Sequence, residues 1–128
     1  MHAVLAFSSL PLFLGAVLSD WAYAATDQVQ WTNFASWLIA GGLALAGVAL
    51  AWAALALLPA RPARDRQALP YLGLLAASFV LGFINALVHA RDAWAAMPAG
   101  LVLSVVVLLL AAVASVLGLA AARRRAVA

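Results

Sequence analysis

Four uninterrupted apolar runs dominate this chain, and each of them is long enough to cross a lipid bilayer. They cover residues 3–25, 31–58, 69–90 and 98–122. An α-helix rises about 1.5 Å per residue, so about 20 residues cross a hydrocarbon layer about 30 Å thick. The runs are rich in Ala and Leu and lack the alternating polarity of membrane strands. The sequence therefore predicts an all-α, multi-pass transmembrane domain that takes up the 128 residues.

The composition agrees with a membrane protein and excludes several kinds of chemistry. Hydrophobic residues make up 69% of the chain and charged residues 9%, whereas a soluble domain is about half apolar and a quarter charged. The chain has no Cys, which excludes disulfides, thiolate metal sites, iron–sulfur clusters and cysteine nucleophiles. Six of the seven basic residues stand in two short clusters beside apolar runs. This pattern is typical of membrane topology and not of a nucleic-acid partner.

Three short connections separate the runs, so neighbouring helices should be antiparallel. The basic clusters then fall on one side of the membrane, and they consist of Arg61, Arg64, Arg66, Arg123, Arg124 and Arg125. The other side has only Arg91 and is rich in tryptophans that suit a membrane interface, namely Trp21, Trp31, Trp37 and Trp94. The positive-inside rule predicts that both termini face the cytoplasm of a bacterial inner membrane.

The first run has an alternative interpretation as a cleaved signal peptide. The stretch "AYAA", residues 22–25, has the small-x-small pattern of a cleavage site after an apolar core. The start of the run, however, has no Lys or Arg, Pro11 interrupts the apolar core, and Asp20 lies just before the supposed site. We therefore expect the first run to be retained as a fourth span, while cleavage would leave three.

Small and polar residues recur in each run with the 3–4 spacing of a left-handed helix bundle. We expect these stripes to face inward, so that the four helices form one bundle. The first and third spans contribute Ala6, Ser9, Phe13, Ala16, Asp20 and Tyr23, and Ser78, Gly82, Asn85, His89 and Asp92. The second contributes Asn33, Trp37, Ala40, Ala44, Gly47, Ala51 and Ala54, and the fourth Ser104, Leu108, Ala111, Ser115, Gly118 and Ala122.

The stretch "INALVHARDAW" places several polar groups at the end of the third span. Asn85 and His89 are one helical turn apart on the inward stripe. His89 lies about 30 Å along its span and Asp20 about 26 Å along the first span, which runs in the same direction. We predict an Asp20–His89 pair supported by Asn85, because lone polar groups are costly in lipid. Residues that could surround this site are Tyr23, Asn33, Trp37 and Asp92.

A structural interpretation of the same residues stays open. Asp20 and Asp92 could each mark a helix end, and His89 could donate one hydrogen bond to a neighbouring helix. Other chemistries fit less well. His2 and His89 are predicted at opposite ends of the bundle, so one subunit cannot hold a bis-histidine haem between them. A metal at His89 and Asp20 would lack the usual second histidine or cysteine, and no metal site is predicted.

Two segments carry a resemblance to a known family. "LPLFLGAVLSDWAYAATDQVQWTNFASWLIAGGLALAG", residues 10–47, and "VLGFINALVHARDAWAAMPAGLVLSVVV", residues 80–107, resemble a bacterial group of small predicted membrane proteins, the domain of unknown function numbered 2231. The resemblance implies a four-span inner-membrane protein and no activity. Relatives that are fused or adjacent to redox proteins also make an electron-transfer setting conceivable.

From these observations we expect a non-enzymatic protein with a small polar site at the periplasmic end of the bundle. The site would bind a small ligand, an ion or a proton, or anchor a subunit. The partners expected are the lipid bilayer and either a second copy of the chain or another membrane protein. No cofactor is expected, but one alternative is a redox accessory subunit that holds a haem or quinone near Trp37, His89 and Met97. The second alternative is a small transporter.

Overall fold

The computed structural model describes residues 1–56 and 68–127, and these residues form six helices. The first span consists of two helices in line, and a four-residue helix lies between the last two spans. In chain order the helices are α1 (His2–Ser8), α2 (Leu10–Thr26), α3 (Val29–Leu55), α4 (Ala68–His89), α5 (Ala93–Ala96) and α6 (Ala99–Val127). The prediction of four membrane-spanning helices is confirmed, because α1 with α2, α3, α4 and α6 are each long and apolar enough to cross a membrane.

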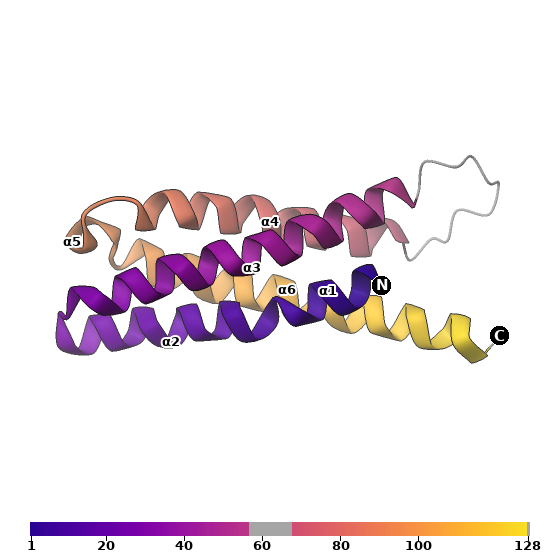
Figure 1. Ribbon diagram of the computed structural model, residues 1–128, viewed down its shortest axis with the longest axis horizontal. Helices are drawn as coiled ribbons and strands as arrows, with labels where there is room; N and C mark the ends of the chain where they lie inside the picture. Colours follow the sequence, from indigo (N-terminus) through magenta and orange to yellow (C-terminus); the bar gives the residue numbers. More distant parts are fainter. Residues whose placement is uncertain (57–67, 128) are drawn as a thin grey trace.

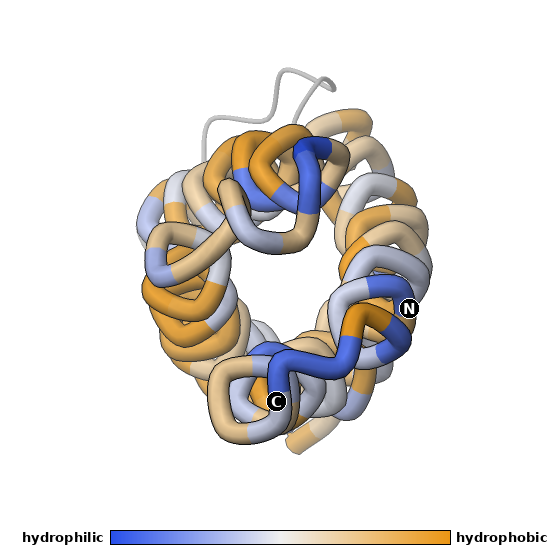
Figure 2. Tube along the Cα trace, turned by 90° about the vertical axis from the view of Figure 1, so that its left-hand side faces the viewer, coloured by the Kyte–Doolittle hydropathy of each residue, from blue (hydrophilic) through white to orange (hydrophobic). Residues whose placement is uncertain are grey.

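The spans form one elongated four-helix bundle (Figure 1). α2 and α4 each pack against both α3 and α6, so α2 and α4 lie diagonally opposite each other across the centre. The view along the bundle shows the same ring of four helices (Figure 2). Met1 and the end of α6 lie at one end, which we call the terminal end, and the α2–α3 connection and α5 lie at the other, which we call the Asp20 end.

Local sequence explains where the first span is interrupted and where it ends. Pro11 has no amide hydrogen, so it cannot continue the helical hydrogen-bond ladder, and the break between α1 and α2 falls at Ser9. Asp27 ends α2 in the left-handed conformation, with φ of 54°, and its amide donates to the Tyr23 carbonyl. Gln28 then serves as the N-cap of α3. The turn is short enough to make α2 and α3 antiparallel neighbours.

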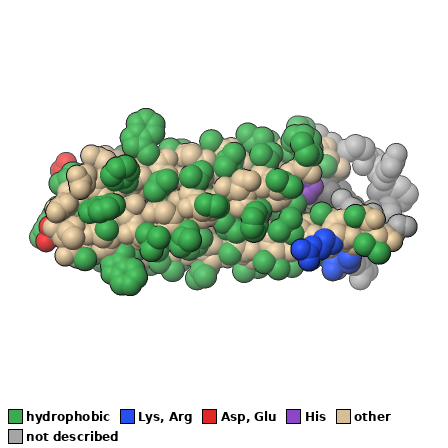
Figure 3. Space-filling model, turned by 60° about the horizontal axis from the view of Figure 1, so that its bottom comes forward, with side chains coloured by type: hydrophobic (Ala, Val, Ile, Leu, Met, Phe, Trp, Pro, Cys, Tyr) green, Lys and Arg blue, Asp and Glu red, His purple; other side chains and the backbone are tan. Residues whose placement is uncertain are grey.

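The surface of the bundle is apolar along most of its length. On the face shown in Figure 3, apolar side chains and backbone cover the middle, while acidic and basic side chains appear toward opposite ends. The interior combines small residues with a few large ones, such as Phe13, Ile39, Leu75 and Val107. This distribution is typical of a bundle whose outer surface faces lipid and whose helices associate through close packing.

Three of the four predicted inward stripes agree with the structure. The predicted stripe of the first span is buried along its whole length, and that of α4 is buried up to His89. In α6, Ser104, Ala111, Ser115 and Gly118 are buried, while Leu108 is half-buried and Ala122 is exposed.

The predicted stripe of the second span is wrong. The buried face of α3 consists of Thr32, Ala35, Ile39, Gly42, Leu43, Ala46, Ala49 and Ala53. Small residues occur on every side of this alanine-rich helix, so their spacing does not determine which side packs inward. The packing of the Phe13 ring determines which side of α3 faces inward. A Cβ atom at Gly42 would lie 2.5 Å from Cε1 of Phe13, so only glycine lets the ring approach α3 this closely.

The orientation of the bundle in the membrane stays a prediction. Arg61, Arg64 and Arg66 lie outside the described residues. Arg123 and Arg124 are exposed near the C-terminal end of α6, and this end of α6 lies at the terminal end of the bundle. The Asp20 end carries Asp27, Arg91 and Asp92, all of which are exposed.

Candidate functional site

Asp20 and His89 meet inside the bundle near the Asp20 end, as the two stripes predict. Asp20 is fully buried on α2, and the last residue of α4 is His89. Nε2 of His89 lies 2.7 Å from Oδ1 of Asp20. Since α2 and α4 are diagonal neighbours, this contact crosses the centre of the bundle. The spatial part of the Asp20–His89 prediction is therefore confirmed.

Two further side chains extend the pair into a network of three spans. Ser104 of α6 donates a hydrogen bond of 2.6 Å to Oδ2 of Asp20. Nδ2 of Asn85 in turn donates to Oγ of Ser104 over 2.8 Å. All four side chains are buried. Asn85 therefore supports the pair as predicted, but it does so through Ser104 and not by direct contact with Asp20.

The hydrogen bonds of His89 determine where its protons lie. Nδ1 lies 3.0 Å from the backbone carbonyl oxygen of Asn85. A carbonyl oxygen only accepts, so Nδ1 must carry a hydrogen and donate it. At 2.7 Å, Nε2 and the Asp20 oxygen also need one hydrogen between them, because two acceptors would repel each other. The pair consequently holds one proton, either as imidazolium with carboxylate or as neutral imidazole with carboxylic acid.

This proton leaves the pair without net charge, which suits a low-dielectric interior. An isolated charge inside a membrane protein is costly, whereas a hydrogen-bonded pair of zero net charge is tolerated. The Ser104 hydroxyl adds a second donor to the same carboxyl group. The carboxyl group of Asp20 is thus held by two hydrogen-bonding side chains, His89 and Ser104.

Small residues of the third connection and of α6 close the site. A Cβ atom on Gly100 would lie 2.8 Å from Cε1 of His89, so the imidazole packs against the α6 backbone, and only glycine allows this approach. Ala96 of α5 is fully buried, and Tyr23 is buried one turn beyond Asp20. Asp20 and His89 are themselves buried, so the pair is shielded from water.

Several residues that the sequence suggested around the site lie elsewhere. Asn33 and Trp37 are exposed on the outward face of α3, and Trp37 has 80% of its surface accessible. Asp92 is exposed at the N-cap of α5. The structure brings only Tyr23 of this surrounding group into the buried interior. For Asn33 and Trp37 the error follows from the wrong stripe of the second span, and for Asp92 from the end of α4 at His89.

Ser104 is the site residue that sequence reasoning missed. The sequence predicts Ser104 only as a member of the inward stripe of the fourth span, because no titratable group is near it in the chain. Its role depends on the relative height of α6 and α2, which the sequence does not state. The available signal was its position five residues from the start of α6, at about the depth of Asn85 on antiparallel α4.

The hydrogen bonds of His89 and the position of Trp37 limit where a metal or a cofactor could bind. Both ring nitrogens of His89 are engaged, so an iron at this residue would have to displace either Asp20 or the Asn85 carbonyl. Trp37, which the redox alternative placed beside His89, faces outward. Within residues 1–56 and 68–127, no group of three or more His, Cys, Asp and Glu side chains is arranged to hold a metal ion.

One polar atom of the network has no protein partner. Oδ1 of Asn85 is buried and accepts no hydrogen bond, although the Nδ2 of the same amide is engaged. A buried carbonyl oxygen ordinarily has at least one donor, from protein or from water. Asn85 therefore presents a spare acceptor beside the Asp20–His89 pair.

Comparison with known proteins assigns the chain to a described group. A family model with the description "Predicted membrane protein (DUF2231)" matches residues 1–128. No curated protein and no solved structure matches the chain.

Proposed function

Since the chain belongs to the DUF2231 family of predicted membrane proteins, whose description names no activity, we propose a function from its buried site: the bundle binds one exchangeable proton between Asp20 and His89. The supporting observation is the short Nε2–Oδ1 contact of a histidine whose Nδ1 is already committed as a donor. In this proposal the protein is not an enzyme. Its function is to bind and release this proton, and the state of the bundle depends on whether the proton is bound.

Loss of the proton changes the force between the two diagonal spans. Without it, the Nε2 lone pair faces a carboxylate oxygen at 2.7 Å, and this contact becomes repulsive. The buried carboxylate would also lose its counter-charge, and Ser104 would be its remaining donor. Deprotonation should therefore separate α4 from α2 or admit water between them. The proton would act as a removable link across the bundle centre.

We further propose that the Asp20 end faces the periplasm of a bacterial inner membrane. The arginines at the terminal end support this orientation, because basic residues concentrate on the cytoplasmic side. The proton would then exchange with the periplasm, because His89 is the last residue of α4 and the pair lies near the Asp20 end. The bilayer is the surrounding partner, and a second copy or another membrane protein could respond to the separation of α2 and α4.

Infrared difference spectroscopy of the purified protein tests the proposal. Between acidic and alkaline buffer the wild type should show a buried carboxyl or carboxylate band that Asp20→Asn abolishes and His89→Gln shifts. Asp27→Asn is a matched control, because Asp27 is exposed and Asn also tolerates its left-handed backbone. Spectra identical in wild type and Asp20→Asn would contradict the proposal. A Soret absorption band in the purified protein would favour the haem alternative instead.

A further inference from the structure

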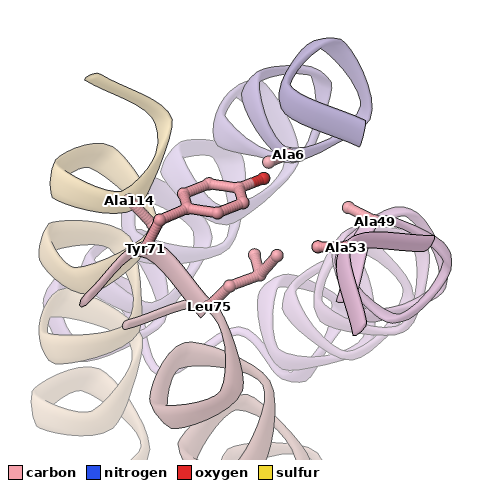
Figure 4. Close-up of a cluster of buried hydrophobic side chains, with 6 residues drawn as sticks. All are labelled: Ala6, Ala49, Ala53, Tyr71, Leu75 and Ala114. Carbon is pink, nitrogen blue, oxygen red and sulfur yellow. The ribbon is translucent and has the colours of Figure 1, made fainter. Parts of the chain in front are cut away.

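A second polar pair joins the same two spans at the terminal end. Nδ1 of His2 lies 3.1 Å from the hydroxyl oxygen of Tyr71, and the two ring centroids are 5.4 Å apart. Figure 4 shows the Tyr71 ring reaching from α4 across the interior toward the helix that carries Ala6. Tyr71 is buried, while His2 is half-buried. A histidine thus forms part of a titratable pair near each end of the bundle.

The two pairs occupy the same faces of their helices. In each pair the partners are 69 residues apart, one on the first span and one on α4. His2 and Asp20 are therefore as far apart in the sequence as Tyr71 and His89. This separation corresponds to about five helical turns and about 27 Å, close to the thickness of a hydrocarbon core. Both pairs consequently border the same interior, one near each boundary of the membrane.

Buried hydroxyl groups lie between the two pairs. Ser9 and Ser78 are buried and donate to the carbonyl oxygens of Ala6 and Leu75. Ser115 of α6 is also buried, and its hydroxyl has no partner. Together with Oδ1 of Asn85, it is a polar atom in an apolar interior, where a water molecule would satisfy it. From each pair toward the centre of the bundle there are thus buried polar groups that can exchange hydrogen bonds with water.

An apolar layer separates these polar groups. It is formed by two clusters of buried residues, namely Phe13, Ala46, Val107 and Ala111, and Ala16, Ile39 and Leu43. On α4 this stretch corresponds to the interval from Ser78 to Asn85, which is about 10 Å of helix. A short file of water molecules would bridge it, and the Phe13 ring is the largest group that such a file would have to displace.

We propose that the bundle transfers protons across the membrane between the His2–Tyr71 pair and the Asp20–His89 pair. The half of this path at the Asp20 end rests on the proton site proposed above. A proton enters at one pair while another leaves at the other, and each hydroxyl or water between them forms one O–H bond as it releases another. No group is oxidised or reduced. Phe13 and its layer form the barrier, and transient water beside Asn85 and Ser115 carries the proton past it.

The proposal takes into account the titratable groups that face this interior. They are His2 and Tyr71 at the terminal end and Asp20, Tyr23 and His89 at the Asp20 end. α3 contains none, and the described arginines of α6, Arg123 and Arg124, are exposed at the terminal end. The interior of the described spans therefore holds no fixed positive charge that would repel a proton between the two pairs.

The experiment uses the full chain in liposomes that contain a pH-sensitive dye, with a potassium diffusion potential to drive protons. The wild type should carry protons faster than protein-free liposomes. Tyr71→Phe keeps the ring and removes only the hydroxyl, and it should slow transfer about tenfold, below the hundredfold typical of a lost proton-transfer group because water can replace it. Phe13→Ala should speed transfer, whereas the control Phe7→Ala, on the exposed face of α1, should leave the rate unchanged.

Ser115→Ala distinguishes an effect on the rate of proton transfer from an effect on the stability of the bundle. The hydroxyl has no partner, so its removal should leave thermal stability unchanged or raised and yet slow proton transfer. Ser8→Ala is the matched control, because Ser8 is exposed and donates to the Val4 carbonyl of its own helix. Wild-type transfer no faster than that of protein-free liposomes would overturn the proposal, as would a rate unaffected by both Tyr71→Phe and Ser115→Ala. If the infrared band of Asp20 is still observed with either of these results, the proposal of a proton site at Asp20 and His89 is kept and only the proposal of a transmembrane path is rejected.

Discussion

The two ends of the bundle join the same pair of diagonal spans through a histidine, but they are built differently. At the Asp20 end, three spans contribute four buried side chains, and the side-chain contacts range from 2.6 to 2.8 Å. At the terminal end, half-buried His2 lies 3.1 Å from the hydroxyl oxygen of Tyr71. Asp20 is a buried carboxyl group that needs hydrogen-bonding partners, whereas the Tyr71 hydroxyl is an uncharged group with a single donor hydrogen. The difference indicates that the first site requires its partners and the second tolerates their loss.

The strongest test of this comparison removes each histidine in turn. His89→Ala leaves the Asp20 carboxyl buried without its partner, and we expect a loss of about 3 kcal/mol in the free energy of unfolding. His2→Ala removes the hydrogen bond to Tyr71, and we expect a loss of about 0.6 kcal/mol for this bond. Unfolding in detergent with increasing denaturant measures both values. Equal losses for the two variants would break the comparison.

A second test acts on the Asp20 end through the backbone of α6. In Gly100→Ala the new Cβ would lie 2.8 Å from the His89 ring, so the imidazole must move away from Asp20, at an expected loss of about 2 kcal/mol. Gly73→Ala is the matched control, because no atom outside its own stretch of helix lies within 4 Å of its Cβ position. The control should gain up to about 1 kcal/mol from helix propensity. Equal thermal stability of the two variants would mean that His89 has room to shift.

A third test measures coupling within each pair. A double-mutant cycle on Asp20→Asn and His89→Ala should give an interaction energy of about 1 to 1.7 kcal/mol, since these residues share one short hydrogen bond and one proton. The corresponding cycle on His2→Ala and Tyr71→Phe should give about 0.6 kcal/mol or less. Additive effects of the substitutions at Asp20 and His89 would mean that the two residues do not interact and are separate interfacial groups.

Mass spectrometry of the mature protein tests whether the first-span partner of each pair, His2 or Asp20, is present at all. His2 and Asp20 both lie before Ala25, so cleavage at the signal-peptide-like site would remove one partner from each pair. We expect the mature chain to retain both residues, because α1 and α2 pack against α3 and α6. A mature chain that begins after the "AYAA" stretch would eliminate both pairs.

Sequence reasoning succeeded where a rare residue marked a helix face. Asp20 and His89 are among very few polar groups in their spans, so their stripes, depths and mutual contact could be predicted from helical geometry. It failed on α3, where alanine and glycine occur on all sides and small size does not select a direction. There the packing of Phe13 against Gly42 decides the inward face, and that contact depends on two helices at once.

The rest of the site required relative heights that no single helix contains. Ser104 joins Asp20 and Asn85 only because α6 is antiparallel to α4 and at a matching depth. Similarly, His2 was predicted at one end of the bundle, but its contact with Tyr71 was not recognised. A serine or tyrosine has many uses in a membrane helix, so these partners become identifiable only once the three-dimensional arrangement is known.

The central claim is that one proton lies between Asp20 and His89 while Nδ1 of His89 stays protonated. Nitrogen-15 NMR of histidine-labelled protein measures this directly, because the chain has only two histidines and His2→Ala leaves His89 alone. Our account predicts a protonated Nδ1 throughout the pH range in which the bundle remains folded, with a hydrogen-bonded Nε2 that Asp20→Asn shifts. An unprotonated Nδ1, or an Nε2 signal unchanged by Asp20→Asn, would contradict the claim.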